Sequence, residues 1–369
     1  MRAVDKSALV FPAGMPAALT WARRALVSGT RLVGASSLPN DPSRDQYPEW
    51  TCLPWIGDPD FDASLVRCLK EMGVETIFTA HTVVSAKLRK LLPEMAPNVR
   101  LESQNAWSEA FADYELYRDV AAGFDFQPLE LAAPAVAKAR LTPLQSAALV
   151  RLFELTPGQC GYQKLEALAA VFRFLPAGDL VEIGSLWGRS AVALAQLARF
   201  YSVGNLLCVD PWRLEDSLHG IPELDSSADE IHIDKVFEGF RMNLAPFAGV
   251  VNYMRSTSVE AAIAYGAGAT FMTEDFGRTT YLGRIALLHI DGNHAVRAVR
   301  SDIALWCRWV QPGGWIVLDD YCWLFVDGPR MAADEFCQEF AGSLAYGFVM
   351  DGSLFLRVVN QIGGARARN

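Results

Sequence analysis

Three aspartates and a histidine stand at the ends of two apolar runs in the second half of the sequence. Asp291 closes the first run, and His294 follows it by three residues. Asp319 and Asp320 close the second run. If the two runs are neighbouring parallel strands, their carboxyl ends lie at one edge of the sheet and the three carboxylates converge. Unpaired carboxylates repel one another, so we expect a divalent cation that prefers oxygen ligands, such as Mg²⁺, Ca²⁺ or Mn²⁺, between them.

A turn with two glycines precedes this region. The residues EIGSLWGRS at positions 182–190 lie between an expected strand that begins at Asp179 and an expected helix over residues 189–200. Glycines permit a tight turn and let the backbone approach a ligand closely. Asp210 ends the next expected strand, where an acidic side chain can accept hydrogen bonds from both hydroxyls of a ribose. Together these features predict a site for a nucleotide-like cofactor, and the glycine spacing, which differs from GxGxxG, disfavours NAD.

Each of these features also has a purely structural interpretation. The glycines could merely turn the chain in an ordinary α/β fold, with Asp210 capping a loop. Asp319 or Asp320 could cap the segment that follows. His294 could lie in the first turn of the next helix, and His289, in the strand before the cluster, is expected to be mainly structural.

The glycine turn and the acidic residue after it resemble two motifs of class I S-adenosylmethionine-dependent methyltransferases. The pattern Glu-x-Gly-x-x-x-Gly-x-Ser, followed by a strand that ends in Asp, resembles motif I and the ribose-binding acid of that class. The resemblance implies that Gly184 and Gly188 flank the methionine part of S-adenosylmethionine. It also implies that Glu182 supports the loop and that Asp210 holds the ribose. The other residues for which we expect a cofactor contact are Ser185, Ser190 and Asp291.

The acidic cluster resembles that of the Mg²⁺-dependent O-methyltransferases, above all the macrocin O-methyltransferase group, which acts on sugar hydroxyls of natural products. The matching segments are Ile-Asp-Gly and the later Asp-Asp-Tyr. The resemblance implies that Asp291, Asp319 and Asp320 bind the metal and that His294 is the general base. A bound divalent cation lowers the pKa of a coordinated hydroxyl, and a histidine can take the proton near neutral pH. The oxygen then attacks the sulfonium methyl group in line.

We therefore expect an enzyme that transfers a methyl group from S-adenosylmethionine to a hydroxyl of a small metabolite or glycoside, assisted by Mg²⁺ or another divalent cation. Two alternatives stay open. The first is metal-independent N- or carboxyl-methylation, in which the acidic cluster binds a cationic substrate. The second is a non-catalytic protein that keeps the S-adenosylmethionine pocket for binding or assembly.

The elements that must position these residues form two α/β patterns. Strands alternate with helices over residues 1–102, which predicts a small Rossmann-like domain with a parallel sheet. Residues 103–175 have a helical period and are expected to form a helical linker or lid. A second alternation over residues 176–369 predicts the class I methyltransferase sheet, which ends in a pair of strands turned by Asp351-Gly352. A chain of 369 residues is long enough for two such Rossmann-like domains.

Two segments of the second pattern have open roles. The acidic and irregular residues 212–243 could form an active-site lid or a solvated surface loop. Residues 272–281 come just before the strand that ends at Asp291 and could line the acceptor pocket.

The N-terminal pattern has a resemblance of its own. Its segments LVFPAGM, GASS and TAH, at residues 9–15, 34–37 and 79–81, resemble the small Rossmann-like domain that precedes ATP-grasp ligase domains. There Gly14 and Ser36 could contact a substrate or a partner. A docking or dimerisation domain is the other interpretation.

The composition argues against several classes of protein. Acidic residues outnumber basic ones by 42 to 33, and the net charge of −9 disfavours nonspecific binding to nucleic acid. Seven cysteines without a CxxC pair are expected to be reduced thiols. Neither a signal peptide nor a membrane span of about 18 apolar residues is expected. We therefore expect a cytoplasmic protein that acts on a small molecule and, by the family resemblance, forms a homo-oligomer.

Overall fold

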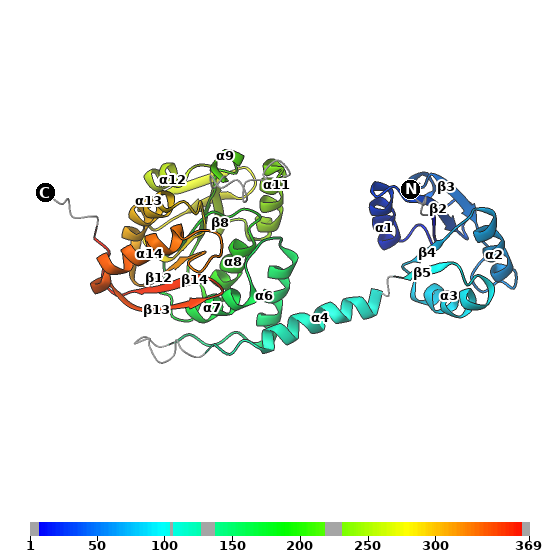
Figure 1. Ribbon diagram of the computed structural model, residues 1–369, viewed down its shortest axis with the longest axis horizontal. Coiled ribbons are helices and arrows are strands. Elements are labelled where there is room, and N and C mark those ends of the chain that lie inside the picture. Colours follow the sequence, from blue (N-terminus) through cyan, green and yellow to red (C-terminus); the bar gives the residue numbers. More distant parts are fainter. Residues whose placement is uncertain (1–6, 104–105, 127–136, 218–230, 364–369) are drawn as a thin grey trace. The chain divides into compact units, whose positions relative to one another are not determined.

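The computed structural model of the chain describes residues 7–103, 106–126, 137–217 and 231–363 (Figure 1). The chain forms two compact units, Met1–Glu115 and Leu116–Asn369, and the boundary lies within helix α4 (Ala106–Ala122). Each unit contains its own α/β sheet, which confirms the predicted fold class. All seven cysteines are free. Among the helices of the described residues, none has the length and apolar character needed to cross a membrane.

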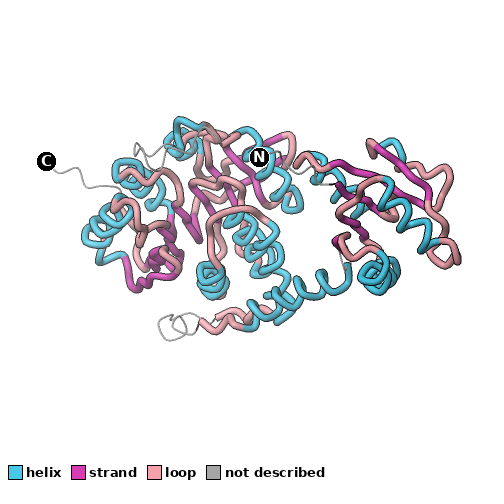
Figure 2. The backbone as a smooth tube through the Cα atoms, turned by 45° about the vertical axis from the view of Figure 1, so that its right-hand side comes forward, coloured by secondary structure: helices cyan, strands magenta, loops and turns pink. Residues whose placement is uncertain are grey.

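The first unit is a parallel sheet with helices on both faces (Figure 2). Its strand order is β3-β2-β1-β4-β5, and every neighbouring pair is parallel. Helix α1 packs on one face through Ala18 and Ala22, and α2 and α3 pack on the other through residues such as Leu65 and Leu88. The elements are β1 (Ser7–Val10), α1 (Pro16–Val27), β2 (Arg31–Ser36), β3 (Glu49–Cys52), α2 (Phe61–Glu71), β4 (Thr76–Thr79), α3 (Thr82–Met95) and β5 (Arg100–Ser103).

The second unit contains a seven-stranded sheet in the order β13-β14-β12-β11-β6-β7-β8. The predicted final pair of strands is confirmed, and β14 lies between β12 and β13, antiparallel to both. One face is covered by helices α6, α7, α8 and α11, and the other by α12, α13 and α14. The strands of this sheet are β6 (Asp179–Ile183), β7 (Leu206–Val209), β8 (Val251–Met254), β11 (Ile285–Ile290), β12 (Val310–Leu318), β13 (Leu344–Met350) and β14 (Ser353–Val358). The helices are α6 (Pro143–Leu155), α7 (Tyr162–Phe172), α8 (Arg189–Tyr201), α9 (Leu214–Ser217), α11 (Ile233–Leu244), α12 (Ser258–Ala264), α13 (Val296–Trp306) and α14 (Gly328–Glu339).

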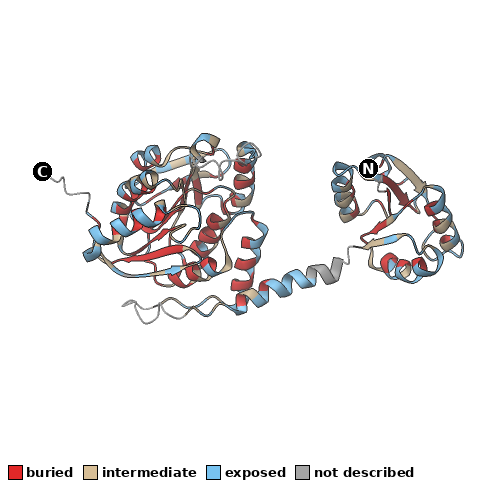
Figure 3. Ribbon diagram, viewed as in Figure 1, coloured by how far each residue is buried: buried red, intermediate tan, exposed pale blue. Residues whose placement is uncertain are grey.

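Helices α6 and α7 lie in the segment predicted as a linker, and they fill the core of the second unit. Helix α6 begins with a capping box formed by Thr142 and Gln145, and Pro143 occupies its first turn. Leu149 of α6 and Leu168 of α7 are fully buried, and both helices contact α8. Figure 3 shows the red, buried inner sides of the helices of this unit. This packing fixes α7 against the sheet and so fixes the polar side chains that α7 carries.

One strand, one helix and one hairpin occur where the sequence pattern does not predict them. Strand β3 is short and only partly buried at the sheet edge, so its apolar alternation is weak. Part of the acidic segment 212–243 forms α11, which buries Val236 and Phe240, while residues 218–230 lie outside the described residues. Strands β9 (Thr270–Thr273) and β10 (Gly277–Thr280) form an antiparallel hairpin next to β8. A role of this hairpin in the acceptor pocket stays a prediction.

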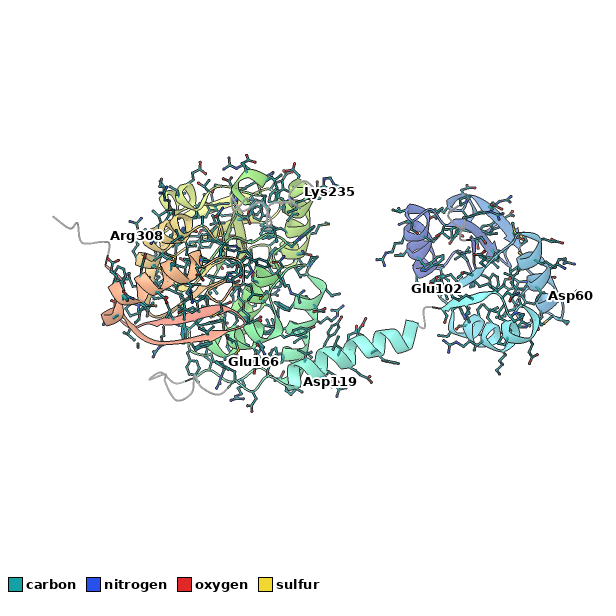
Figure 4. All side chains as sticks on the ribbon, in the orientation of Figure 1. Asp60, Glu102, Asp119, Glu166, Lys235 and Arg308 are labelled. Carbon is teal, nitrogen blue, oxygen red and sulfur yellow. The ribbon has the colours of Figure 1, made fainter. Side chains whose placement is uncertain are left out.

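Asp302 of α13 is a buried acid and gives a stability prediction. Charged side chains such as Lys235 and Arg308 lie on the outside of the unit (Figure 4), whereas Asp302 is only 6% exposed. Burial raises its pKa to about 6. The folded protein therefore holds a proton that the unfolded chain releases between about pH 4 and pH 6, and stability falls as the pH rises through this window.

We expect Asp302→Asn to remove this loss, because asparagine carries no charge at any pH. The variant should be more stable than the wild type by about 2–3 kcal/mol at pH 8 and should gain nothing at pH 4. Urea unfolding at the two pH values measures this difference. An equal change in stability at both pH values would contradict the explanation.

Candidate active site

Three strands of the second unit end in one row at the same edge of the sheet. Ile290 of β11 pairs with Ile183 of β6 on one side and with Leu318 of β12 on the other. The amide of Asp291 continues this ladder and donates to the carbonyl of Ile183 over 2.8 Å. The amide of Asp319 donates to the carbonyl of Ile290 over 2.9 Å. The two acidic strand ends and the glycine turn, residues 184–188, are therefore brought together, as the sequence predicts.

The two glycines of the turn have a backbone conformation that is unfavourable for any residue with a Cβ atom. Gly184 and Gly188 have φ angles of +81° and +87°. A Cβ atom on Gly184 would lie 2.0 Å from the carbonyl oxygen of Asp291. A Cβ atom on Gly188 would lie 2.5 Å from the side chain of Leu244. Both glycines are therefore needed for the shape of the turn, Gly184 for its close approach to the acidic strand end and Gly188 for its close approach to α11, independently of any cofactor.

Asp210 fixes the glycine turn from the end of β7. Its Oδ2 accepts hydrogen bonds from the amides of Ser185 and Leu186 over 2.9 and 3.0 Å. Its Oδ1 accepts from the amide of Trp212 over 2.7 Å. Burial raises the pKa of this carboxyl, and the three hydrogen bonds oppose the rise. Because a carboxylate has about four acceptor positions, Asp210 can accept a further hydrogen bond.

Glu182 and His289 form a buried polar link between the glycine turn and the acidic cluster. Glu182 is fully buried and accepts a hydrogen bond from Ser185 Oγ over 2.6 Å. His289 Nδ1 lies 3.0 Å from the other oxygen of Glu182, and His289 Nε2 lies 3.8 Å from Asp319. Ser190 is buried in the first turn of α8. Glu182 therefore binds the glycine turn through Ser185 and the acidic cluster through His289.

Lys164 of α7 reaches the acidic cluster, and it is not among the residues predicted from the sequence. Its side chain is only 1% exposed, and its ammonium group forms an ion pair with Asp319 Oδ2. Burial lowers the pKa of Lys164, but the Asp319 carboxylate raises it further, so the net shift is upward and the amine stays charged. The sequence does contain a signal, because Lys164 lies on the apolar stripe of its helix with Leu168 and Val171.

Lys164 makes the pKa of Asp319 differ from that of Asp291. Burial would raise the pKa of Asp319, yet Lys164 and His289 hold it well below the usual range. Ser353 Oγ and the amide of Asp320 donate to the remaining oxygen of Asp319. Burial and the neighbouring Asp319 raise the pKa of Asp291 well above its usual range. Asp319 is therefore the charged partner of Lys164. The sequence argument for a cation assumes that the carboxylates are unpaired, and for Asp319 this assumption is wrong.

His294 pairs with Asp320 at the more open side of the cluster. Its Nε2 lies 2.8 Å from Asp320 Oδ2, and the two side chains are 17% and 27% exposed. The indole of Trp323 meets the imidazole edge to face, with ring centroids 4.6 Å apart. A carboxylate that binds an imidazole orients the ring and stabilises its protonated form, which is the arrangement of a general base and its orienting acid.

Two overlapping groups of side chains could hold a metal ion. The ligand atoms of Asp291, His294 and Asp320 all lie within 4.8 Å of one another, and so do those of His289, Asp291 and Asp319. The second group is already occupied by Lys164, which binds Asp319. The two carboxylates of the first group, Asp291 and Asp320, are oxygen donors of the kind that Mg²⁺ and Mn²⁺ prefer.

Comparisons with known proteins show what this part of the chain is similar to. Residues 181–321 match the family model of a methyltransferase domain. Among solved structures, the O-methyltransferase NovP is similar at 16% identity and a TM-score of 0.40, over 69% of this chain and 100% of that one. Cofactor-bound Rv0187 from MTB is similar at 18% identity and a TM-score of 0.37, over 59% of this chain and 90% of that one. MycE, solved with Mg, SAH and mycinamycin VI, is similar at 13% identity and a TM-score of 0.37, over 63% of this chain and 57% of that one. No curated protein matches by sequence.

Proposed function

We propose that this chain, which by the fold and the methyltransferase domain at residues 181–321 is a class I S-adenosylmethionine-dependent methyltransferase, methylates a hydroxyl oxygen of a small-molecule acceptor. The observation that carries the proposal is the pair of His294 and Asp320, 2.8 Å apart beside the cofactor edge. A hydroxyl must lose its proton as the oxygen attacks, whereas a carboxylate acceptor has none to lose. A positioned base is therefore the feature that an O-methyltransferase for hydroxyls requires.

The charges of the site favour S-adenosylmethionine over a cofactor with phosphates. The amides of the glycine turn that donate to acceptors within the protein are those of Gly184, Ser185, Leu186 and Gly188. These amides are not free to bind a phosphate, which is how glycine turns hold nucleotides. The acidic side chains at this edge attract a cationic group such as a sulfonium. The acceptor position left on Asp210 suits a ribose hydroxyl.

The residues of the chain then have separate tasks. His294 accepts the proton of the acceptor hydroxyl, and Asp320 orients the imidazole and stabilises its positive charge. The new bond joins the acceptor oxygen to the methyl carbon as the bond from that carbon to sulfur breaks, and S-adenosylhomocysteine leaves. Trp323 packs on His294, and Leu324 and Phe325 next to it are 96% and 63% exposed. These side chains offer an apolar wall for the body of the acceptor.

The described residues fit a divalent cation at Asp291 and Asp320, with His294 beside them. Asp319, the third ligand predicted from the sequence, is the least suited of the aspartates because Lys164 and Ser353 already bind its oxygens. A divalent cation bound here would act as a Lewis acid that lowers the pKa of the acceptor hydroxyl. Asp291 must be ionised to bind the ion, so protons and the ion compete for this carboxylate.

The main experiment measures S-adenosylhomocysteine released from S-adenosylmethionine with phenols, glycosides and primary amines as acceptors. Turnover with hydroxyl acceptors is the expected result. Turnover with amines alone would overturn the proposal. The absence of any rise in melting temperature on addition of S-adenosylhomocysteine would count against the cofactor itself.

Removal of divalent cations should lower the activity. We expect EDTA to reduce the rate by at least about tenfold and Mg²⁺ or Mn²⁺ to restore it. Asp291→Asn should shift the metal concentration that gives half-maximal rate upward, while exchange of the exposed Asp327 for asparagine should leave it unchanged. Full activity in EDTA would exclude the metal and leave His294 and Asp320 as a metal-independent base.

A further inference from the structure

The first unit contains a cavity of about 440 Å³ that the proposed methyl transfer does not use. Its lining comes from the segments that follow four strands, namely β1, β2, β3 and β4. In the strand order β3-β2-β1-β4-β5, the chain runs outward from β1 to β2 and β3 and then crosses to β4 on the other side of β1. Ligands of open α/β sheets bind at the carboxyl ends of the strands where the order reverses in this way. The volume lies in the range of small-molecule sites.

One side of this cavity is formed by large apolar side chains that the fold leaves open to solvent. Trp55, Leu38 and Val83 all line it, and they are 63%, 46% and 59% exposed. They come from three different segments of the chain, after β3, after β2 and at the start of α3. An exposed indole beside aliphatic side chains is suited to stacking on a flat ring, and a nucleic-acid base is such a ring.

The polar side of the cavity contains an acidic residue. Asp41, which follows β2, is 9% exposed, and its Oδ1 accepts from the amide and the hydroxyl of Ser43 over 2.9 and 2.6 Å. Burial would raise the pKa of Asp41, but hydrogen bonds from Ser36 and Ser43 hold it below the usual value. Asp41 is thus an ionised acceptor in a cavity whose described lining residues include neither lysine nor arginine. This charge attracts hydroxyl and amine donors and repels phosphate.

His81 gives the cavity a hydrogen-bond donor. Its Nδ1 accepts a hydrogen bond from the amide of Val83 over 3.2 Å, at the N-terminus of α3. In the neutral imidazole the proton must then lie on Nε2, which makes that nitrogen a donor. A ring nitrogen or carbonyl of a base is the matching acceptor.

We propose that this cavity binds a nucleoside, a flat base joined to a sugar with free hydroxyls and without a phosphate. The base would stack on Trp55, and the sugar hydroxyls would donate to Asp41, as ribose hydroxyls do to the acid after the second strand of dinucleotide-binding folds. The absence of phosphate follows from the charge of Asp41. This proposal does not depend on the methyl transfer proposed for the second unit.

The test is isothermal titration of the full chain, first saturated with S-adenosylhomocysteine so that the cofactor site of the second unit is filled. The probes are adenosine, guanosine, cytidine and uridine, together with AMP. We expect at least one nucleoside to bind and AMP to bind at least about tenfold more weakly than adenosine. Asp41→Asn and Trp55→Ala should each weaken the nucleoside by about tenfold. Asp45→Asn removes the same charge from an exposed position of the same unit and should leave binding unchanged.

Three outcomes overturn the proposal. The first is no binding heat with any of the four nucleosides. The second is AMP that binds as tightly as adenosine or more tightly, because the cavity would then be a phosphate site. The third is nucleoside binding that neither Asp41→Asn nor Trp55→Ala weakens, which would place the binding elsewhere. Asparagine keeps the acceptor oxygen for Ser43, and Trp55 is largely exposed, so both variants should fold.

Discussion

Replacement of His294 by alanine should lower kcat by about 10²–10⁴-fold while the affinity for S-adenosylhomocysteine stays within about twofold. The loss is this large because the variant lacks the imidazole that we propose takes the proton of the acceptor hydroxyl. Asp320→Asn should also lower the rate, because it removes both the orienting partner of the imidazole and one of the two carboxylates proposed for the metal. Single-turnover rates at saturating cofactor, with S-adenosylhomocysteine affinity measured separately, check both variants.

The pH profile and metal affinity distinguish a base from a metal ligand. The rate of the wild type should fall as the solution is made acidic, because a protonated imidazole cannot accept a proton. If His294 is the base, His294→Ala removes the acid dependence that is measured at saturating metal, and it keeps the metal affinity. If it is a ligand instead, the variant loses metal affinity and higher metal concentrations recover its rate. His232→Ala, at an exposed position of the same unit, is the matched control and should behave as the wild type. Normal turnover in His294→Ala would refute the assignment.

Replacement of Lys164 by methionine should destabilise the second unit by about 3–5 kcal/mol. Methionine fills much of the same space, so the cost comes from the Asp319 charge, which then lacks its buried cation. The exchange also removes the charge that keeps Asp319 ionised, and the two aspartates should then repel each other or share protons differently. Urea unfolding followed by fluorescence measures the loss, and Lys235→Met, on the outer surface of α11, should cost almost nothing (Figure 4).

A double variant shows whether the loss is electrostatic. Lys164→Met combined with Asp319→Asn removes both charges, so it should recover a large part of the stability lost in Lys164→Met alone. If the double variant is as unstable as the sum of the two single variants, the ion pair does not explain the effect. A single variant Lys164→Met with wild-type stability would show that the pair is not buried in solution.

Much of the fold and the position of the site can be predicted from the sequence. The sequence predicts two α/β domains because apolar residues recur with a period of two in strands and of about 3.6 in helices. Both periods are local properties of the chain and can be read without the tertiary structure. The glycine turn and Asp210 can be found because glycines and a strand-end acid stand at fixed offsets from apolar runs. The convergence of Asp291 and Asp319 also follows, since the carboxyl ends of neighbouring parallel strands lie at one edge.

Other parts could not be predicted, because they depend on contacts between distant segments. Strand β3 and helix α11 have weak or charged patterns, so packing rather than local period decides them. The cavity of the first unit is lined by segments that follow four different strands, so the sequence of one segment alone does not predict it.

What the sequence alone determined is the identity and the place of the acidic cluster at the sheet edge. What only the tertiary structure decided is which acid has which partner. Lys164 and Asp319 are 155 residues apart in the chain, and the ion pair forms because α7 packs on the sheet with a lysine on its buried side. The ammonium group of Lys164 pairs with Asp319, and Asp320 pairs with His294. A buried charge needs a partner, and the packing of α7 decides which acid provides it.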